Sequence, residues 1–155
     1  LVDEACTEVR KIAHDMMPVS LQKLGLVKAV EELCRKQNQA NGLQFHFQHF
    51  GEIQRMESSK EIMLYRICQE LINNILKHAE AKEVIVQLTQ VEDTLSLTVE
   101  DDGIGFEPTT LNKQKSLGLR SVESRVKYLN GAISIDAQLH HGTSVNIEIP
   151  IVQQF

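Results

Sequence analysis

Two pairs of short alternating segments constrain the fold of this chain more than any other feature of its sequence. Residues 83–90 and 94–101 alternate apolar and polar side chains on either side of a short polar turn, and so do residues 132–138 and 143–151. Such alternation is typical of half-buried strands, and a tight turn between two of them indicates a β-hairpin. The sequence therefore predicts two antiparallel hairpins.

The rest of the chain is mostly helical in pattern. Apolar residues recur at helical spacing in four stretches, residues 1–17, 26–40, 57–79 and about 117–129. Pro18 should end the first helix, and a short joint should follow around Gly25. Residues 43–49 alternate and predict one more strand. Because strands and helices do not alternate one for one, a parallel Rossmann sheet is not expected. We predict an α+β fold: a two-layer α/β sandwich whose mixed, mostly antiparallel sheet has helices on one face, with a short N-terminal helix added.

Composition excludes several classes of protein. A net charge of −5 with scattered lysines and arginines argues against a nucleic-acid partner. No apolar run approaches the roughly 20 residues that cross a bilayer, so no membrane contact is expected. Cys6, Cys34 and Cys68 form no CxxC pattern and predict reduced, buried thiols in a cytoplasmic protein. At 155 residues the chain suits one globular domain with a short appendage.

Polar residues on the helix at 57–79 form the first candidate site. No GxxxxGK[ST] pattern occurs, which excludes a P-loop. Glu70, Asn74 and Lys77 lie at i, i+4 and i+7, on one arc that borders the apolar stripe. An acid, an amide and a cation suit a hydrated Mg²⁺ and its phosphates, because Mg²⁺ takes oxygen ligands and keeps several waters. Taken alone, the pattern favours an ordinary solvated helix face.

The strand at 94–101 ends in a second candidate site. Asp101 is in phase with the inward apolar residues of this strand, whereas Asp102 points the other way. A core-facing carboxylate is costly unless it finds a donor, and the amino group of adenine is such a donor. Gly103 and Gly105 would let the backbone pass close to a ligand. A plain turn is the alternative, since Asp-Asp-Gly is also turn chemistry.

Two further pieces follow in the last third of the chain. The polar stretch at 107–120 has the length of a lid, and Ser116 can cap the next helix. The amides of Gly118 and Leu119 would then point at an anion, as helix N-termini do. Thr143 could reach a phosphate or merely close its turn. A surface loop with an ordinary cap is the alternative for this region.

In this order and at these spacings, the pieces resemble the motifs of the histidine kinase ATPase domain of the GHKL, or Bergerat, superfamily. QELINNILKHA matches the asparagine box, DDGIGF the first glycine box, and SLGLRSVESRVKYLNG the second, with a terminal Gly-Thr. No motif is specific alone, but the set is, and it covers about residues 7–150. Without a separate phenylalanine box, the chain is most similar to the short-lid subfamily that uses a two-helix, HisKA_3-type dimerisation domain.

The resemblance implies a role for each matching residue. Asp101 would bind the adenine amino group, with Gly103 and Gly105 shaping the pocket. Asn74 would ligate Mg²⁺, and Glu70 would act on the water of the metal or as general base. The nucleotide-binding set is completed by Lys77, Ser116, Gly118, Leu119 and Thr143, of which Lys77, Gly118 and Thr143 would contact phosphates. Ser116 replaces the first glycine of the second glycine box, which puts the phosphate cradle there in question.

The implied function is that of the Mg-ATP-binding catalytic domain of a two-component sensor histidine kinase. Such a domain donates the γ-phosphoryl group of ATP to a histidine, from which the receiver domain of a response regulator takes it, and its parent works as a cytoplasmic-facing homodimer. Residues 1–18 resemble the remnant of the second dimerisation helix, and residues 19–155 would be the catalytic domain. The acceptor histidine is therefore expected outside this chain, with His14, next to Asp15, as the alternative. Alone, the chain should bind ATP and autophosphorylate little or not at all.

Two other functions stay open. One is a stand-alone serine kinase of the anti-sigma-factor type, against which the dimerisation-like segment argues. The other is a non-enzymatic docking module with a degenerate nucleotide pocket. The presence of Glu70, Asn74 and Asp101 argues against that reading.

Overall fold

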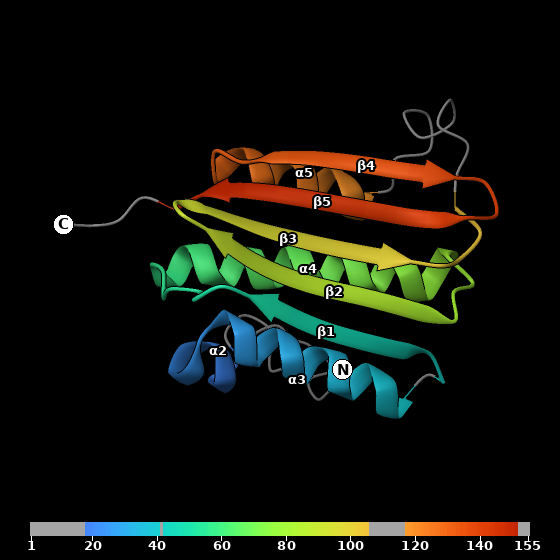
Figure 1. The fold of residues 1–155 in the computed structure, drawn as a ribbon, viewed down its shortest axis with the longest axis horizontal. Coiled ribbons are helices and arrows are strands. Elements are labelled where there is room, and N and C mark those ends of the chain that lie inside the picture. The colour runs from blue at the N-terminus through green and yellow to red at the C-terminus, as the bar shows by residue number, and fades with distance from the viewer. Residues whose placement is uncertain (1–17, 41, 106–116, 152–155) are drawn as a thin grey trace, which may run out of the picture.

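The structure, a computed structural model, describes residues 18–40, 42–105 and 117–151. The expected helix at 1–17, the remnant it would form, and most of the expected lid lie outside these residues. The elements in chain order are α2 (Val19–Leu24), α3 (Leu26–Ala40), β1 (Gln44–Phe50), α4 (Ser58–His78), β2 (Glu83–Val91), β3 (Thr94–Asp101), α5 (Leu117–Tyr128), β4 (Ala132–Gln138) and β5 (Gly142–Pro150) (Figure 1).

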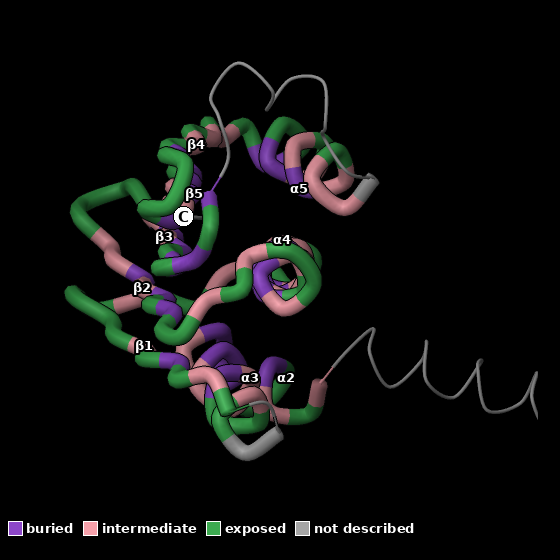
Figure 2. Tube along the Cα trace, turned by 90° about the vertical axis from the view of Figure 1, so that its right-hand side faces the viewer, coloured by how far each residue is buried: buried purple, intermediate pink, exposed green. Residues whose placement is uncertain are grey.

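The strands form one five-stranded sheet in the order β1-β2-β3-β5-β4. β1 runs parallel to β2, and every other neighbouring pair is antiparallel. Both predicted hairpins, β2–β3 and β4–β5, are present. All described helices cover the same face of the sheet, with α4 lying between α5 and the α2–α3 pair (Figure 2). The predicted α+β sandwich with a mixed, mostly antiparallel sheet is confirmed.

Two local expectations need correction. The segment before Gly25 was expected to be a joint, but Val19–Leu24 form the short helix α2. Gly25, at φ +94°, ends this helix, because the left-handed region is open to glycine without steric cost. The strand expected at 43–49 lies one residue later, at Gln44–Phe50.

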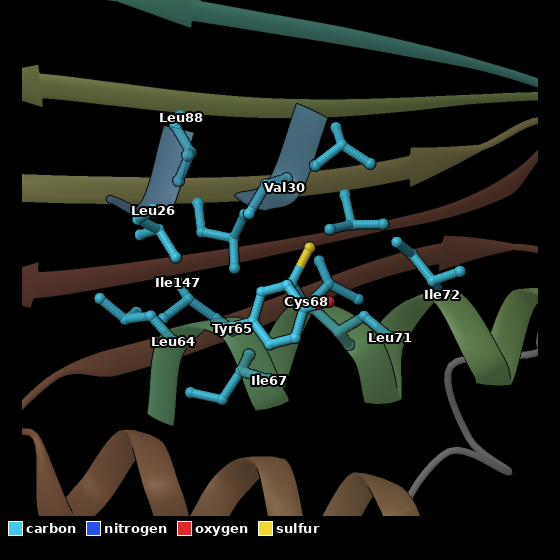
Figure 3. Close-up of a cluster of buried hydrophobic side chains, with 14 of the residues drawn as sticks. Leu26, Val30, Leu64, Tyr65, Ile67, Cys68, Leu71, Ile72, Leu88 and Ile147 are labelled. Carbon is cyan, nitrogen blue, oxygen red and sulfur yellow. The ribbon is translucent and has the colours of Figure 1, made fainter. Parts of the chain in front are cut away.

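The core fills the space between the sheet and α4. Every second residue is buried along β3 and, from Val84 to Leu88, along β2, as a sheet with one covered face requires. Several of the largest fully buried side chains lie on α4 and on the strands beneath it, among them Leu64, Ile67, Ile72, Leu88 and Ile147 (Figure 3). α4 is thus held along most of its length. Cys34 and Cys68 are buried free thiols in the same core, as predicted.

Arg55, in the segment between β1 and α4, connects α2 to the first turns of α4. Glu61 is only 3% exposed, and Arg55 donates to it from Nε and from Nη2, both at 3.2 Å. The Arg55 guanidinium also donates to the carbonyl oxygens of Gln22 at 3.1 Å and of Lys23 at 3.4 Å. These carbonyls lie at the end of α2, where helical partners run out. Arg55 therefore fastens the C-terminal turn of α2 to α4.

No helix among the described residues is both long enough and apolar enough to cross a membrane.

Candidate functional site

Asp101 occupies the position that its phase predicted. It is the last residue of β3, points to the covered side of the sheet and is 7% exposed. Its Oδ1 accepts a hydrogen bond of 2.9 Å from the N–H of Gly103. Burial raises the pKa of this carboxyl above its ordinary value, while hydrogen bonds from the backbone of Gly103 and Thr143 act against the rise. Among the described residues no lysine or arginine forms an ion pair with Asp101. A buried carboxylate without a cation is suited to accept a hydrogen bond from a ligand.

Asp102 is exposed and points the other way, as predicted. Its Oδ1 accepts hydrogen bonds from the N–H groups of Lys82 at 2.8 Å and Glu83 at 3.0 Å. These bonds, that from Glu83 first, lower the pKa of Asp102. The two neighbouring carboxyls therefore differ in environment: one is aimed into the fold, and the other is bound to the start of β2.

The loop after β3 is pressed between two other segments. A Cβ on Gly103 would collide with the carbonyl oxygen of Ala79 at the end of α4, and the N–H of Ile104 donates to that same oxygen at 2.7 Å. A Cβ on Gly105, which has φ +64°, would collide with the carbonyl oxygen of Gln138. Both positions thus require glycine for close approach, and Gly105 also for its conformation. The loop joins the end of β3 to the end of α4 and to the β4–β5 turn.

Glu70 and Asn74 meet the first turn of α5, where Gly118 lies. A Cβ on Gly118 would lie 2.7 Å from Oε2 of Glu70 and 3.4 Å from Oδ1 of Asn74. Glu70 and Asn74 therefore approach α5 from the same side of α4, and both are partly buried. Lys77, one turn further on, is exposed. An oxygen atom of an acid and one of an amide thus both lie close to the N-terminal turn of a second helix.

Of the other expected site residues, the structure describes some and not others. Thr143 lies opposite Asp101 in the β3–β5 pairing, so the structure places it beside the buried carboxylate. Leu119 lies in the first turn of α5, next to Gly118. Ser116 and His14 lie outside the described residues. The carboxyl end of β3, the C-terminal end of α4 and the N-terminal end of α5 lie at the same end of the molecule (Figure 1).

The donors present fit the groups that the resemblance implies. Asp101 offers a buried acceptor of the kind an amino group on a base needs. Asn74 and Glu70 offer two oxygen-bearing side chains, which suits a Mg²⁺ ion that keeps most of its waters and takes phosphate oxygens. The described residues contain no group of three or more histidine, cysteine or carboxylate side chains that could hold a metal ion. A Mg²⁺ ion there would take its remaining ligands from water and phosphate.

Sequence reasoning missed the contacts of Asp102 and the ion pair of Arg55 with Glu61. The partners of Asp102 lie 19 and 20 residues away in the sequence. Arg55 and Glu61 are six residues apart, but the carbonyls of α2 that Arg55 also binds lie up to 34 residues away. For Asp102, a usable signal was the outward acid that directly follows an inward one at a strand end. For Glu61 the sequence carries no comparable signal, since an acid in the first turns of a helix is normally exposed.

Comparison with known proteins agrees with this geometry. Residues 59–153 match the family described as histidine kinase-, DNA gyrase B- and HSP90-like ATPase. The match takes in α4, the loop after β3 and α5, where the candidate site lies. The chain belongs to this ATPase family, and the resemblance stated from its motifs is confirmed.

Named relatives and a solved structure narrow the comparison. The chain is 31% identical over 154 residues to the signal transduction histidine-protein kinase/phosphatase DegS of Brevibacillus brevis, covering 99% of this chain and 40% of the relative. It is 35% identical over 139 residues to DegS of Bacillus subtilis strain 168, covering 86% and 36%. The chain therefore spans about two fifths of the length of these relatives. The histidine kinase domain of the Erythrobacter litoralis EL346 blue-light activated histidine kinase shares the fold, with a TM-score of 0.66 at 24% identity, over 81% of this chain and 61% of that one.

Proposed function

We propose that this chain is the ATP-binding catalytic domain of a two-component sensor histidine kinase and that it binds Mg-ATP at the end of the sheet where β3 terminates. The observation that carries the proposal is Asp101, a buried carboxylate that only backbone N–H groups satisfy among the described residues. Family membership supports ATP as the ligand. The names of the relatives support a histidine as acceptor.

Within this proposal each side chain has one task. Asp101 accepts a hydrogen bond from the adenine amino group, while Gly103 and Gly105 keep the loop clear of side chains. Asn74 holds Mg²⁺, and Glu70 orients a water of the metal or accepts the proton of the attacking imidazole.

Gly118 and Leu119 present N–H groups of the first turn of α5 to phosphate oxygens, with Lys77 adding charge. Ser116 and Thr143 remain predicted nucleotide contacts.

The chemistry of the bound nucleotide is phosphoryl transfer, for which a protein mainly supplies alignment and electrostatic stabilisation. In the longer parent this domain would serve a dimerisation domain that carries the acceptor histidine, and a receiver domain of a response regulator would take the phosphoryl group. The homodimer of the parent, the role of residues 1–18 as a dimerisation remnant, and His14 as an alternative acceptor stay predictions. The free buried thiols Cys34 and Cys68 support a reducing, cytoplasmic setting.

Calorimetric titration with Mg-ADP tests the binding site. We expect Asp101→Asn to weaken binding by about ten- to a hundredfold, because a hydrogen bond to a charged acceptor contributes about 1.5–3 kcal/mol. Asp136→Asn, which removes the same charge from an exposed position on β4, serves as control and should bind like wild type. A well-folded wild type that does not bind Mg-ADP would overturn the proposal in favour of a docking module.

The acceptor is tested by incubating radiolabelled ATP with this chain alone and, separately, with a longer form of the parent. Label on a histidine is lost in acid and kept in alkali, whereas label on a serine survives acid. Acid-labile label on the longer form, with little or none on this chain alone, is the expected result. Acid-stable label would favour the serine kinase.

A further inference from the structure

Asp102 has no task in the site described so far, yet its side chain accepts two hydrogen bonds from residues 19 and 20 positions earlier in the chain. Its Oδ1 accepts the N–H groups of Lys82 and Glu83, and its own N–H donates to the carbonyl oxygen of Glu83 at 3.3 Å. The residue that follows β3 is therefore bound three times to the start of β2. An exposed acid without these partners would leave the chain free to turn at this point.

The residues on both sides of Asp102 make close contacts of their own. Before it, the Asp101 carboxylate receives the N–H of Gly103 at 2.9 Å. After it, the N–H of Ile104 donates to the carbonyl oxygen of Ala79 at 2.7 Å, and Gly103 passes that oxygen with no room for a Cβ. Since Ala79 directly follows α4, the loop links the buried carboxylate to the helix that bears Glu70 and Asn74.

We propose that Asp102 is a positioning residue for the nucleotide site: by holding the amides of Lys82 and Glu83 it fixes the loop at 101–104 against the end of α4. Asp101 on the sheet and the polar arc on α4 are thereby kept in one arrangement. This inference rests on the proposed function, because it assigns Asp102 to that same site. Asp102 itself does not touch the nucleotide.

The carboxylate acts here as an acceptor, not as a charge. Its hydrogen bonds come from the backbone, and the attraction of the Lys82 side chain is the smallest of the influences on its pKa. A negative charge next to a site for an anionic nucleotide opposes binding by simple electrostatics. When this side chain is removed, electrostatics alone predicts tighter nucleotide binding, whereas loss of positioning predicts weaker binding. That difference provides the test.

Mg-ADP affinity is measured by calorimetry for wild type, Asp102→Ala, Asp102→Asn and Asp102→Glu. We expect Asp102→Ala to raise the Kd about tenfold, the lower end of the loss found when residues that position metal ligands from behind are removed. Asp102→Asn keeps an oxygen that accepts the same two N–H groups and should stay within about threefold of wild type.

Asp102→Glu keeps the charge but moves the acceptor, so it should weaken binding, and it provides a folded comparison if the alanine variant unfolds. Asp136→Ala on β4 removes the same charge elsewhere and should bind like wild type. Folded Asp102→Ala or Asp102→Glu that binds as tightly as wild type, or more tightly, overturns the inference.

A second measurement needs no nucleotide and separates this inference from the proposed function. Amide hydrogen exchange of Gly103 and Ile104 in the nucleotide-free chain should accelerate about tenfold in Asp102→Ala and remain unchanged in Asp102→Asn. If wild type fails to bind Mg-ADP while these amides respond as stated, the proposed function fails and Asp102 still positions the loop. If the amides of Asp102→Ala exchange as in wild type, the positioning role is overturned whether or not the nucleotide binds.

Discussion

The backbone of Gly118 on α5 lies so close to Glu70 on α4 that a Cβ at position 118 would be 2.7 Å from the Oε2 atom of Glu70. The atom in the way is the far end of a flexible side chain. A methyl group can therefore be accommodated, provided that the Glu70 carboxylate moves. The absence of a side chain at this helical position thus sets where a proposed catalytic carboxylate rests.

Gly118→Ala should separate stability from function. Alanine favours a helix over glycine by about 0.5–1 kcal/mol, and Gly118 has no left-handed backbone that would forbid it. We expect the free energy of unfolding in urea to stay level or rise by that amount. The affinity for Mg-ADP should fall about tenfold, because the Glu70 carboxylate can no longer keep its position. Adenosine, which carries no phosphate, should bind as to wild type, and an equal loss for both ligands would contradict this explanation.

Asp101→Asn should stabilise the nucleotide-free chain at neutral pH. Burial raises the pKa of Asp101 above its ordinary value of 3.8, so the folded state disfavours the ionised form. The stability that this group contributes is fully present below the unfolded pKa and is lost as the pH rises through the folded pKa. The neutral amide, which can still accept the N–H of Gly103, avoids that loss. Urea unfolding at several pH values should show the variant more stable at pH 7, with the difference vanishing near and below pH 3.8. A variant less stable than wild type at pH 7 would contradict the prediction that burying the ionised Asp101 carboxyl costs stability.

Asp102→Asn should show the opposite dependence on pH. Hydrogen bonds from the backbone lower the pKa of Asp102 below 3.8. Its contribution is therefore present above that value and is lost as the pH falls through the folded pKa. The variant should be slightly less stable than wild type at pH 7 and equal to it in strong acid. The same urea series measures the effect, and a gap between the two proteins that widens in acid would rule it out.

The sequence predicted those parts of the fold that local periodicity controls. The strands of the hairpins and the inward phase of Asp101 follow from side-chain alternation, and the long helix α4 follows from helical spacing of its apolar residues. Helix α2 was missed, because six residues are too few to show a helical period and their end carbonyls are satisfied by a distant arginine. The closeness of Gly118 and Glu70 was not predictable from spacing either, since it depends on how two helices pack. The site residues came as a set from the resemblance, while the contact that orients them, through Asp102, required the register of two strands.

Arg55→Met should destabilise the fold more than the loss of an ordinary surface ion pair does. It would leave the Glu61 carboxylate, 3% exposed, without its partner, and the last carbonyls of α2 without a donor. An unpaired buried charge is costly, but Arg55 is itself half-exposed and solvent screens part of the pair, so we expect a loss of about 1–3 kcal/mol. Lys28→Met, which breaks the exposed pair of Lys28 with Glu31, is the matched control and should cost at most about 0.5 kcal/mol. Adding Glu61→Gln to Arg55→Met should recover part of the loss, because a neutral amide is less costly to bury than a carboxylate. Urea unfolding of the four proteins measures these differences. If Arg55→Met costs no more than Lys28→Met, the pair does not fasten α2 to α4.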